Sequence, residues 1–218
     1  MNRSAPGKLA SRPRLQVKTP GRMPYLPALR LQHELVELRI QDRIDDQLLL
    51  LEHDPVLTVG RGAEVSELAS SPFPKVEIER GGAVTYHGPG QLVGYPILKL
   101  PPDRRDLHRY LRGLESVLIR VVRELGLPAG RRAPLTGVWV GDRKIASIGV
   151  AVRRWVTYHG FALNVETDLS VYRTFRPCGL PGEVMSSLSE LGLSPDPLEL
   201  IELVVRAVAE EFEREATR

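Results

Sequence analysis

Helical periodicity is clearest in the middle of the chain, where leucine and valine recur at every third or fourth position. The apolar positions between 107 and 125 form one stripe of an amphipathic helix. Asp106 is a candidate N-cap, and Gly126 is a natural end. A helix with one apolar face has to bury that face against another element. We therefore expect this helix to pack on a sheet.

Two further stripes predict helices near the two ends of the chain. The first covers positions 28–38, directly after Pro24 and Pro27. The second begins at Asp196, with Glu199 three residues later in the spacing of a capping box. The expected buried face of this last helix is Leu198, Ile201, Val205, Val208 and Phe212.

Strand signals fill the segments between these helices. Continuous apolar runs or β-branched stretches, bounded by glycine, proline or aspartate, predict strands at 48–51, 56–59, 75–79, 83–87, 92–98 and about 155–165. Residues 139–152 read as a hairpin around Gly141 and Asp142. Because the helices flank a block of strands instead of alternating with each strand, we predict an α+β fold with a mixed or antiparallel sheet.

The charge pattern divides the chain near residue 22. Residues 1–22 hold six basic residues, three prolines and no acidic residue. Removing those six from the 30 basic residues leaves 24 against 27 acidic ones, so the rest of the chain has a net charge of −3. We predict a disordered basic extension over 1–22 and a single domain over 23–218.

Composition argues against several classes of protein. With 42% hydrophobic residues, the chain can bury a substantial core, but it holds no apolar run of about 18 residues and no secretory pattern. Because the body of the chain is acidic, the high pI does not indicate a nucleic-acid partner. A single cysteine precludes an intramolecular disulfide and agrees with a reducing compartment. We expect a cytoplasmic protein without membrane or nucleic-acid partners.

That cysteine, Cys178, lies in the segment RPCGLPG at 176–182, whose prolines and glycines exclude regular structure on both sides. Free cysteines are commonly small buried hydrophobes. A loop cysteine with backbone N–H groups nearby is also a candidate nucleophile, and the residues leave both interpretations open. As a nucleophile it needs an imidazole or an amine to favour the thiolate.

Lys144 is the candidate amine. It follows the predicted turn at 141–142, and its neighbours Ala146, Ser147 and Gly149 are small, so a ligand or a second loop could approach that strand closely. By spacing alone, the simpler interpretation of Lys144 is a solvated charge at the end of a hairpin.

The segment 80–91 is the densest in glycine, with four glycines in its first eleven residues. It matches neither the P-loop nor the dinucleotide fingerprint, so phosphate binding is not indicated. His87 within it is a base, an orienting group or a buried core histidine. The five histidines show no metal-ligand spacing, and no cofactor is indicated. Arginine pairs at 104–105, 131–132 and 153–154 are solvated faces or docking sites for an acidic partner.

Together these residues resemble a known family, the lipoyl (octanoyl) transferases, which share their fold with lipoate and biotin protein ligases. The motifs that carry the resemblance are HDPVLTVGR at 53–61, RGGAVTYHGPGQLVGYPI at 80–97, GVWV at 137–140, KIASIGV at 144–150, HGFALNV at 159–165 and PCGL at 177–180. One departure is Met185, where the family commonly has threonine.

The resemblance implies an ATP-independent acyltransferase, with 23–218 as its catalytic domain and no cofactor. It implies that Cys178 carries the octanoyl group as a thioester and that Lys144 lowers the pKa of that thiol. Octanoyl-acyl carrier protein would be the donor. Lipoyl domains of 2-oxoacid dehydrogenase complexes and the glycine cleavage H protein would be the acceptors, in the first step of lipoate synthesis on proteins. The implied acyl-binding residues are Arg80, Gly81, Gly82, Ala83, Val84, Thr85, Tyr86, His87, Ser147, Ile148, Gly149, Gly160, Phe161 and Ala162.

Two alternatives remain at this stage. A lipoate or biotin ligase of the same fold would activate a free acid with ATP and would need no loop cysteine, so Cys178 favours transfer. A non-catalytic module that holds lipoyl domains would tolerate Cys178→Ser without loss of function.

Overall fold

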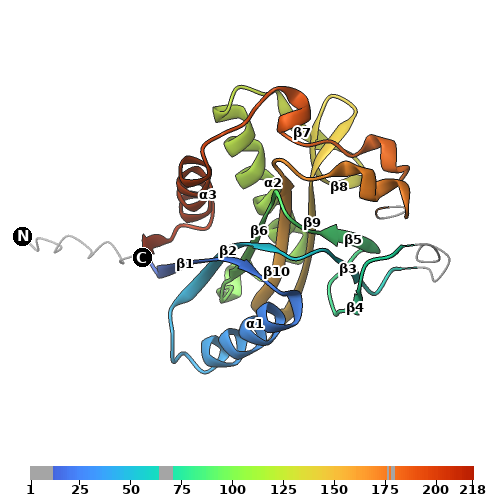
Figure 1. Ribbon diagram of the computed structural model, residues 1–218. Coiled ribbons are helices and arrows are strands. Elements are labelled where there is room, and N and C mark those ends of the chain that lie inside the picture. Colours follow the sequence, from blue (N-terminus) through green and yellow to red (C-terminus); the bar gives the residue numbers. More distant parts are fainter. Residues whose placement is uncertain (1–11, 64–70, 176, 178–179) are drawn as a thin grey trace, which may run out of the picture.

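The structure, a computed structural model, describes residues 12–63, 71–175, 177 and 180–218 (Figure 1). Its largest element is an eight-stranded sheet in the order β11-β1-β2-β6-β10-β9-β8-β7. The strands are β1 (Arg14–Met23), β2 (Asp46–His53), β6 (Gln91–Ile97), β7 (Ala129–Arg132), β8 (Leu135–Val140), β9 (Arg143–Arg153), β10 (Val156–Asn164) and β11 (Glu215–Thr217). A three-stranded sheet holds β3 (Val56–Val59), β4 (Lys75–Glu77) and β5 (Val84–His87).

The large sheet is mixed, because β1 pairs in parallel with β2 and β11 while the pairs from β2 to β7 are antiparallel. In the described part of the chain, three α-helices accompany it: α1 (Tyr25–Ile40), α2 (Leu107–Glu124) and α3 (Pro197–Glu211). Short 3-10 turns cover 102–104, 169–173, 182–184 and 189–191. The predicted α+β class with a mixed sheet and flanking helices is confirmed.

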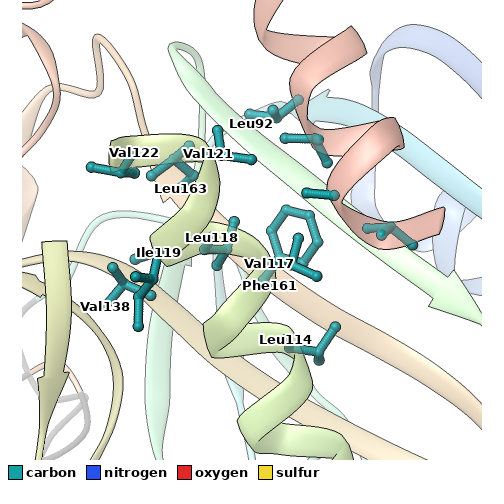
Figure 2. Close-up of a cluster of buried hydrophobic side chains, with 14 of the residues drawn as sticks. Leu92, Leu114, Val117, Leu118, Ile119, Val121, Val122, Val138, Phe161 and Leu163 are labelled. Atoms are coloured by element: carbon teal, nitrogen blue, oxygen red, sulfur yellow. The ribbon is translucent and has the colours of Figure 1, made fainter. Parts of the chain in front are cut away.

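The helices cover opposite faces of the sheet, with α1 on one side and α2 and α3 on the other (Figure 1). Alternating residues of β2 serve the two cores: Leu48 and Leu50 pack toward α2 and α3, and Leu49 and Leu51 pack toward α1. Figure 2 shows how Leu114, Val117 and Leu118 of α2 meet Phe161 and Leu163 of β10. Among the described residues, no helix has the length and apolar character that crossing a membrane requires.

The N-caps predicted for α2 and α3 and the end predicted for α2 hold in the structure, whereas α1 begins at Tyr25, before Pro27. Asp106 accepts a hydrogen bond from the backbone N–H of Arg109, and Gly126 follows α2 with a φ of +98°. Asp196 accepts from the N–H groups of Leu198 and Glu199 at the start of α3.

The predicted buried face of α3 is wrong in part. Leu198 is 72% exposed, whereas Leu200, Val204 and Ala207 are buried. Apolar residues cover more than half of this helix, so periodicity alone does not locate the centre of its buried face.

The predicted disordered extension over 1–22 is also wrong for the part that the structure describes as β1, while residues 1–11 lie outside the described residues. Leu15 is fully buried, and Val17 packs against the same core. Pro20 is tolerated because it lies at the register shift between Lys18 and Gly21 and beyond the three β1 residues that pair with β11. The domain therefore begins before residue 23.

Candidate functional site

A cavity lies on the α1 side of the large sheet, where β9 and β10 meet the segment that leads into β5. Many of the residues that the sequence singles out line it: Arg80, Thr85, His87, Ser147, Ile148, Gly149, Gly160, Phe161 and Ala162. Three distant segments of the sequence thus meet at one place. We refer to this space as the first cavity.

Two glycines let the walls of the first cavity approach one another. A β-carbon on Gly149 would lie 2.9 Å from Cδ of Arg80, and one on Gly160 would clash with the backbone oxygen of Gly94. The backbone N–H of Gly81 donates to the oxygen of Val150 over 3.1 Å. A second loop therefore packs against β9, as the small residues there predicted.

Arg80 fixes that loop from within. Its side chain is buried, with Nη1 donating to the oxygen of Gly81 over 2.9 Å. Its Nη2 donates to the backbone oxygen and the hydroxyl of Thr58 over 2.9 and 3.0 Å. Three acceptors thereby hold this buried guanidinium in one orientation at the cavity wall.

The structure does not bring Ala83, Val84 and Tyr86 into the first cavity. Val84 and Tyr86 lie on the opposite face of β5, in an apolar cluster with Tyr172, whose ring lies edge-on to that of Tyr86. Alternate residues of a strand point to opposite faces, so a continuous motif cannot contribute every side chain to one pocket.

Lys144 is buried on β9, with 4% of its surface exposed. The solvated-charge interpretation is therefore wrong. Its ammonium lies 5.9 Å from the ring centroid of Trp139, and its stem passes Gly137, where a β-carbon would lie 2.7 Å from Cε. Gly137 has a φ of +132°, so both its backbone conformation and its missing side chain suit this passage. Gly137 thereby makes room for a lysine inside the protein.

A second cavity, of about 320 Å³, adjoins the first and shares Ile148 and Gly149 with it. This volume is at the lower end of the range of small-molecule pockets. Its lining is mostly apolar: Gly81, Gly82, Leu107, Leu111, Pro134, Leu135, Thr136, Lys144, Ile148, Gly149, Val150 and Leu180. Lys144 is the only cation among these described lining residues.

Cys178 lies outside the described residues, together with Arg176 and Gly179. The described residues after it return to β9. Met185 forms an isolated parallel β-bridge with Lys144, and the N–H of Ser186 donates to the backbone oxygen of Lys144 over 2.9 Å. Met185, the departure from the family pattern, is buried in an apolar cluster with Tyr172 and Phe175.

Three histidines lie in or beside the first cavity, and burial lowers the pKa of each one. The pKa of His87 lies well below its usual value, first because of burial and then because of His53. Burial, and then the charge of Arg80, lowers the pKa of His159 to about 4. These imidazoles are therefore neutral near pH 7.

Sequence reasoning missed four residues that line the first cavity: Tyr25, Ile78, Tyr95 and His159. Tyr95 and His159 stand inside quoted motifs, so their positions carried a signal that was not used. Tyr25 and Ile78 belong to no motif and reach the cavity through the tertiary fold. Within the described residues, no group of three or more histidine, cysteine, aspartate or glutamate side chains could hold a metal ion.

Comparison with known proteins gives a consistent result. The family model for the lipoyl protein ligase A/B catalytic domain matches residues 24–213. The octanoyltransferase of Gloeobacter violaceus is 53% identical over 171 residues, 77% of this chain and 77% of that protein. The octanoyltransferase of Solibacter usitatus is 47% identical over 205 residues, 89% of this chain and 91% of that protein.

A similar solved structure is a putative lipoate protein ligase from T. acidophilum with bound lipoic acid. It superposes with a TM-score of 0.74 at 19% identity, over 94% of this chain and 88% of that one. At this identity the match concerns the fold alone.

Proposed function

Because this chain belongs to the lipoyl protein ligase A/B catalytic-domain family, we propose a mechanism in which Cys178 carries the octanoyl group as a thioester. The family and its named relatives make the chain an acyltransferase that transfers octanoyl groups in lipoate biosynthesis. An octanoyl donor and lipoyl-domain acceptors are therefore its general partners. The proposal concerns the route of the acyl group, the residues that move it and the particular partners.

In the first half-reaction, the thiolate of Cys178 attacks the thioester carbonyl of octanoyl-acyl carrier protein. A bond from the carbonyl carbon to the sulfur of Cys178 forms as the bond to the carrier sulfur breaks. The carrier leaves as a thiol after taking a proton from the ammonium of Lys144. A nearby ammonium also favours the thiolate before the attack.

In the second half-reaction, a lysine amine of the lipoyl domain attacks the Cys178 thioester. Neutral Lys144 accepts the proton that the amine loses, and the thiolate of Cys178 is released as the amide forms. Exchange between thioesters is nearly isoenergetic and amide formation runs downhill, so the cycle needs no ATP. Both residues return to their starting states.

The observation that carries this proposal is the shared lining of the second cavity. Lys144 lines it from β9, and Leu180, two residues after Cys178, lines it as well. Since Lys144 is buried beside the acyl-binding residues, its charge acts inside the protein instead of in solvent. We propose that the acyl chain lies against the wall formed by Ile148 and Gly149, which both cavities share.

The proposed donor is octanoyl-acyl carrier protein. The proposed acceptors are lipoyl domains of 2-oxoacid dehydrogenase complexes and the glycine cleavage H protein, all met in the cytoplasm. We propose that the residues of 80–87, 147–149 and 160–162 whose side chains face the first cavity bind the octanoyl chain.

The test combines the purified chain, octanoyl-acyl carrier protein and a lipoyl domain without any nucleotide, and it follows the mass of the lipoyl domain. We expect one octanoyl group to be added to its lysine. Product from free octanoate only when ATP is present would instead identify a ligase. Binding of the lipoyl domain without product, unchanged in Cys178→Ser, would identify a non-catalytic binding module.

A further inference from the structure

A chain of two side-chain amides, Gln91 and Asn164, connects His87 to the segment that follows Cys178. Gln91 is the first residue of β6, and Asn164 is its cross-strand partner at the end of β10. Both are about 1% exposed. Both stand within the quoted motifs, yet the mechanism above assigns neither a role.

Two backbone carbonyls fix the orientation of the amides. Because a carbonyl only accepts, the group of Asn164 that lies 2.9 Å from the oxygen of Ser186 has to be its Nδ2. Its Oδ1 then accepts from Nε2 of Gln91 over 2.9 Å. The same Nε2 donates to the backbone oxygen of Tyr86 over 3.2 Å, which uses both of its protons.

The orientation of Gln91 determines the tautomer of His87. The atom that remains for Nδ1 of His87, at 2.8 Å, is Oε1 of Gln91, which can only accept. Nδ1 therefore carries the proton, and in the neutral imidazole Nε2 holds a lone pair. Burial keeps this ring neutral by lowering its pKa.

Aromatic neighbours hold the ring itself in place. Tyr25 stacks on His87 with ring centroids 5.9 Å apart and planes 9° apart, and His53 meets it edge-on at 5.6 Å. The ring lines the first cavity. Since Gln91 occupies Nδ1, Nε2 is the nitrogen that a group in the cavity can reach.

We propose that Gln91 and Asn164 are positioning residues that hold His87 as the Nδ1–H tautomer, so that Nε2 presents a hydrogen-bond acceptor to the reacting groups. This deepens the proposed function and rests on it. The donor that suits this acceptor is one N–H of the incoming lysine amine, while Lys144 takes the proton that the amine loses. Nε2 of His87 is thereby oriented as a hydrogen-bond acceptor before any substrate binds.

The same pair links the cavity wall to the catalytic lysine. The N–H of Leu188 donates to the backbone oxygen of Asn164 over 3.0 Å, and the N–H of Ser186 donates to that of Lys144 over 2.9 Å. A shift of Asn164 would therefore disturb His87 on one side and the backbone of Lys144 on the other.

The first test uses the unmodified protein and no turnover. Long-range ¹H–¹⁵N spectra distinguish the two imidazole tautomers, and comparison with His87→Asn identifies the His87 signals. We expect the Nδ1–H form near pH 7. The Nε2–H form would overturn the proposal. Because this readout needs no substrate, it is independent of whether the chain transfers octanoyl groups.

The second test replaces the amide by a thioether of similar length in Gln91→Met. We expect the His87 spectrum to lose its Nδ1–H preference and kcat to fall about 10- to 100-fold, as for other groups that orient a functional imidazole, with little change in KM for the donor. Gln47→Met is the matched control, since Gln47 is buried at the start of β2 and donates to the backbone oxygen of Asp45 over 3.0 Å.

Gln47→Met should keep both the His87 spectrum and kcat, and circular dichroism checks that both variants fold. A Gln91→Met variant with unchanged tautomer and unchanged kcat would overturn the positioning role and leave the transferase function standing. Absence of transfer by the unmodified chain would instead reject the proposed function and leave the tautomer assignment standing.

Discussion

The two faces of the large sheet solve different problems with the same strands. Toward α2 and α3, residues such as Leu114, Leu118 and Leu163 fill space with apolar volume (Figure 2). Toward α1 and the small sheet, buried polar groups such as His87 and His159 line the first cavity. The apolar face contributes stability through packing, whereas each polar group on the other face needs its own partner. The comparison teaches that one layer of strands separates a space-filling core from the polar first cavity, while the second cavity lies beside the start of α2.

The largest effect is expected at Lys144, in the second cavity. Lys144→Met keeps the apolar stem and removes the charge. We expect octanoyl transfer to fall by about 10²- to 10⁴-fold, the usual contribution of a positioned proton carrier. Thermal unfolding should remain cooperative, because methionine fills much of the volume that the apolar stem of the lysine occupies.

Steady-state transfer and thermal unfolding are the two measurements for this variant. Arg143→Ala, at the neighbouring position and paired with Glu190 at 3.2 Å on the surface, serves as the control and should transfer at nearly the normal rate. Retention of most activity in Lys144→Met would contradict the proposed role of this lysine as a proton carrier.

The opposite result is expected on the apolar face. Leu118 is fully buried, so Leu118→Ala should lower the free energy of unfolding by about 2–5 kcal/mol through lost contacts and a residual cavity. The value of kcat, measured where the variant remains folded, should stay close to normal. Urea titration and steady-state kinetics check the two halves. A large fall in kcat without loss of stability would show that the centre of α2 contributes to the chemistry.

Acid should lower the free energy of unfolding through the buried histidines in and beside the first cavity. The folded-state pKa values of His53, His87 and His159 are lowered, so below about pH 6.5 the unfolded chain binds protons that the folded chain does not. The free energy of unfolding should therefore fall as pH falls from about 6.5 toward 4, by up to about 1.4 kcal/mol per pH unit for each histidine. Urea midpoints measured across this range check the slope.

His159→Asn sharpens that prediction. His159 has a φ of +55°, which asparagine tolerates better than most residues, and its ring faces Glu79 and Arg80. Removing this imidazole should make stability less dependent on pH between 6.5 and 4. An unchanged slope would assign the acid sensitivity to other groups.

The smallest effect is expected at the exposed start of α3. Leu198→Ser should change the free energy of unfolding by no more than about 0.5 kcal/mol, because the side chain is 72% exposed. Leu200→Ala, two residues later and buried, should cost about 2–5 kcal/mol. Thermal denaturation of the pair tests the observed burial of this helix against the face that its periodicity predicts.

The elements that the sequence predicted well are those with local signals. The caps of α2 and α3 and the turn at Gly141 depend on neighbouring residues, and they form where expected. β1 and β11 were missed because they are specified by distant partners. β7 was missed although it pairs with the nearby β8, because its sequence AGRR holds a single apolar side chain. Arg214, directly before β11, donates to the buried carboxylate of Asp46 over 2.6 Å, a contact across most of the chain.

The same distinction applies to the site. Motifs located Arg80, His87 and Gly149 on the cavity wall, since glycine-rich segments carry their own signal. No local pattern could show that Lys144 is buried, because its burial depends on the passage beside Gly137 and on the return of residues 185–186 to β9. Tyr25 reaches His87 only through the packing of α1.

Intact-mass spectrometry tests the central claim most directly. The chain is mixed with octanoyl-acyl carrier protein without an acceptor and quenched in acid. Its intact mass shows whether an octanoyl group was added, and a digest then locates the modified peptide. We expect one octanoyl adduct on the peptide that contains Cys178, no adduct in Cys178→Ser and much slower formation in Lys144→Met. Octanoyl transfer to a lipoyl domain by Cys178→Ser at the normal rate, or an adduct on another residue, would contradict a route through this thiol.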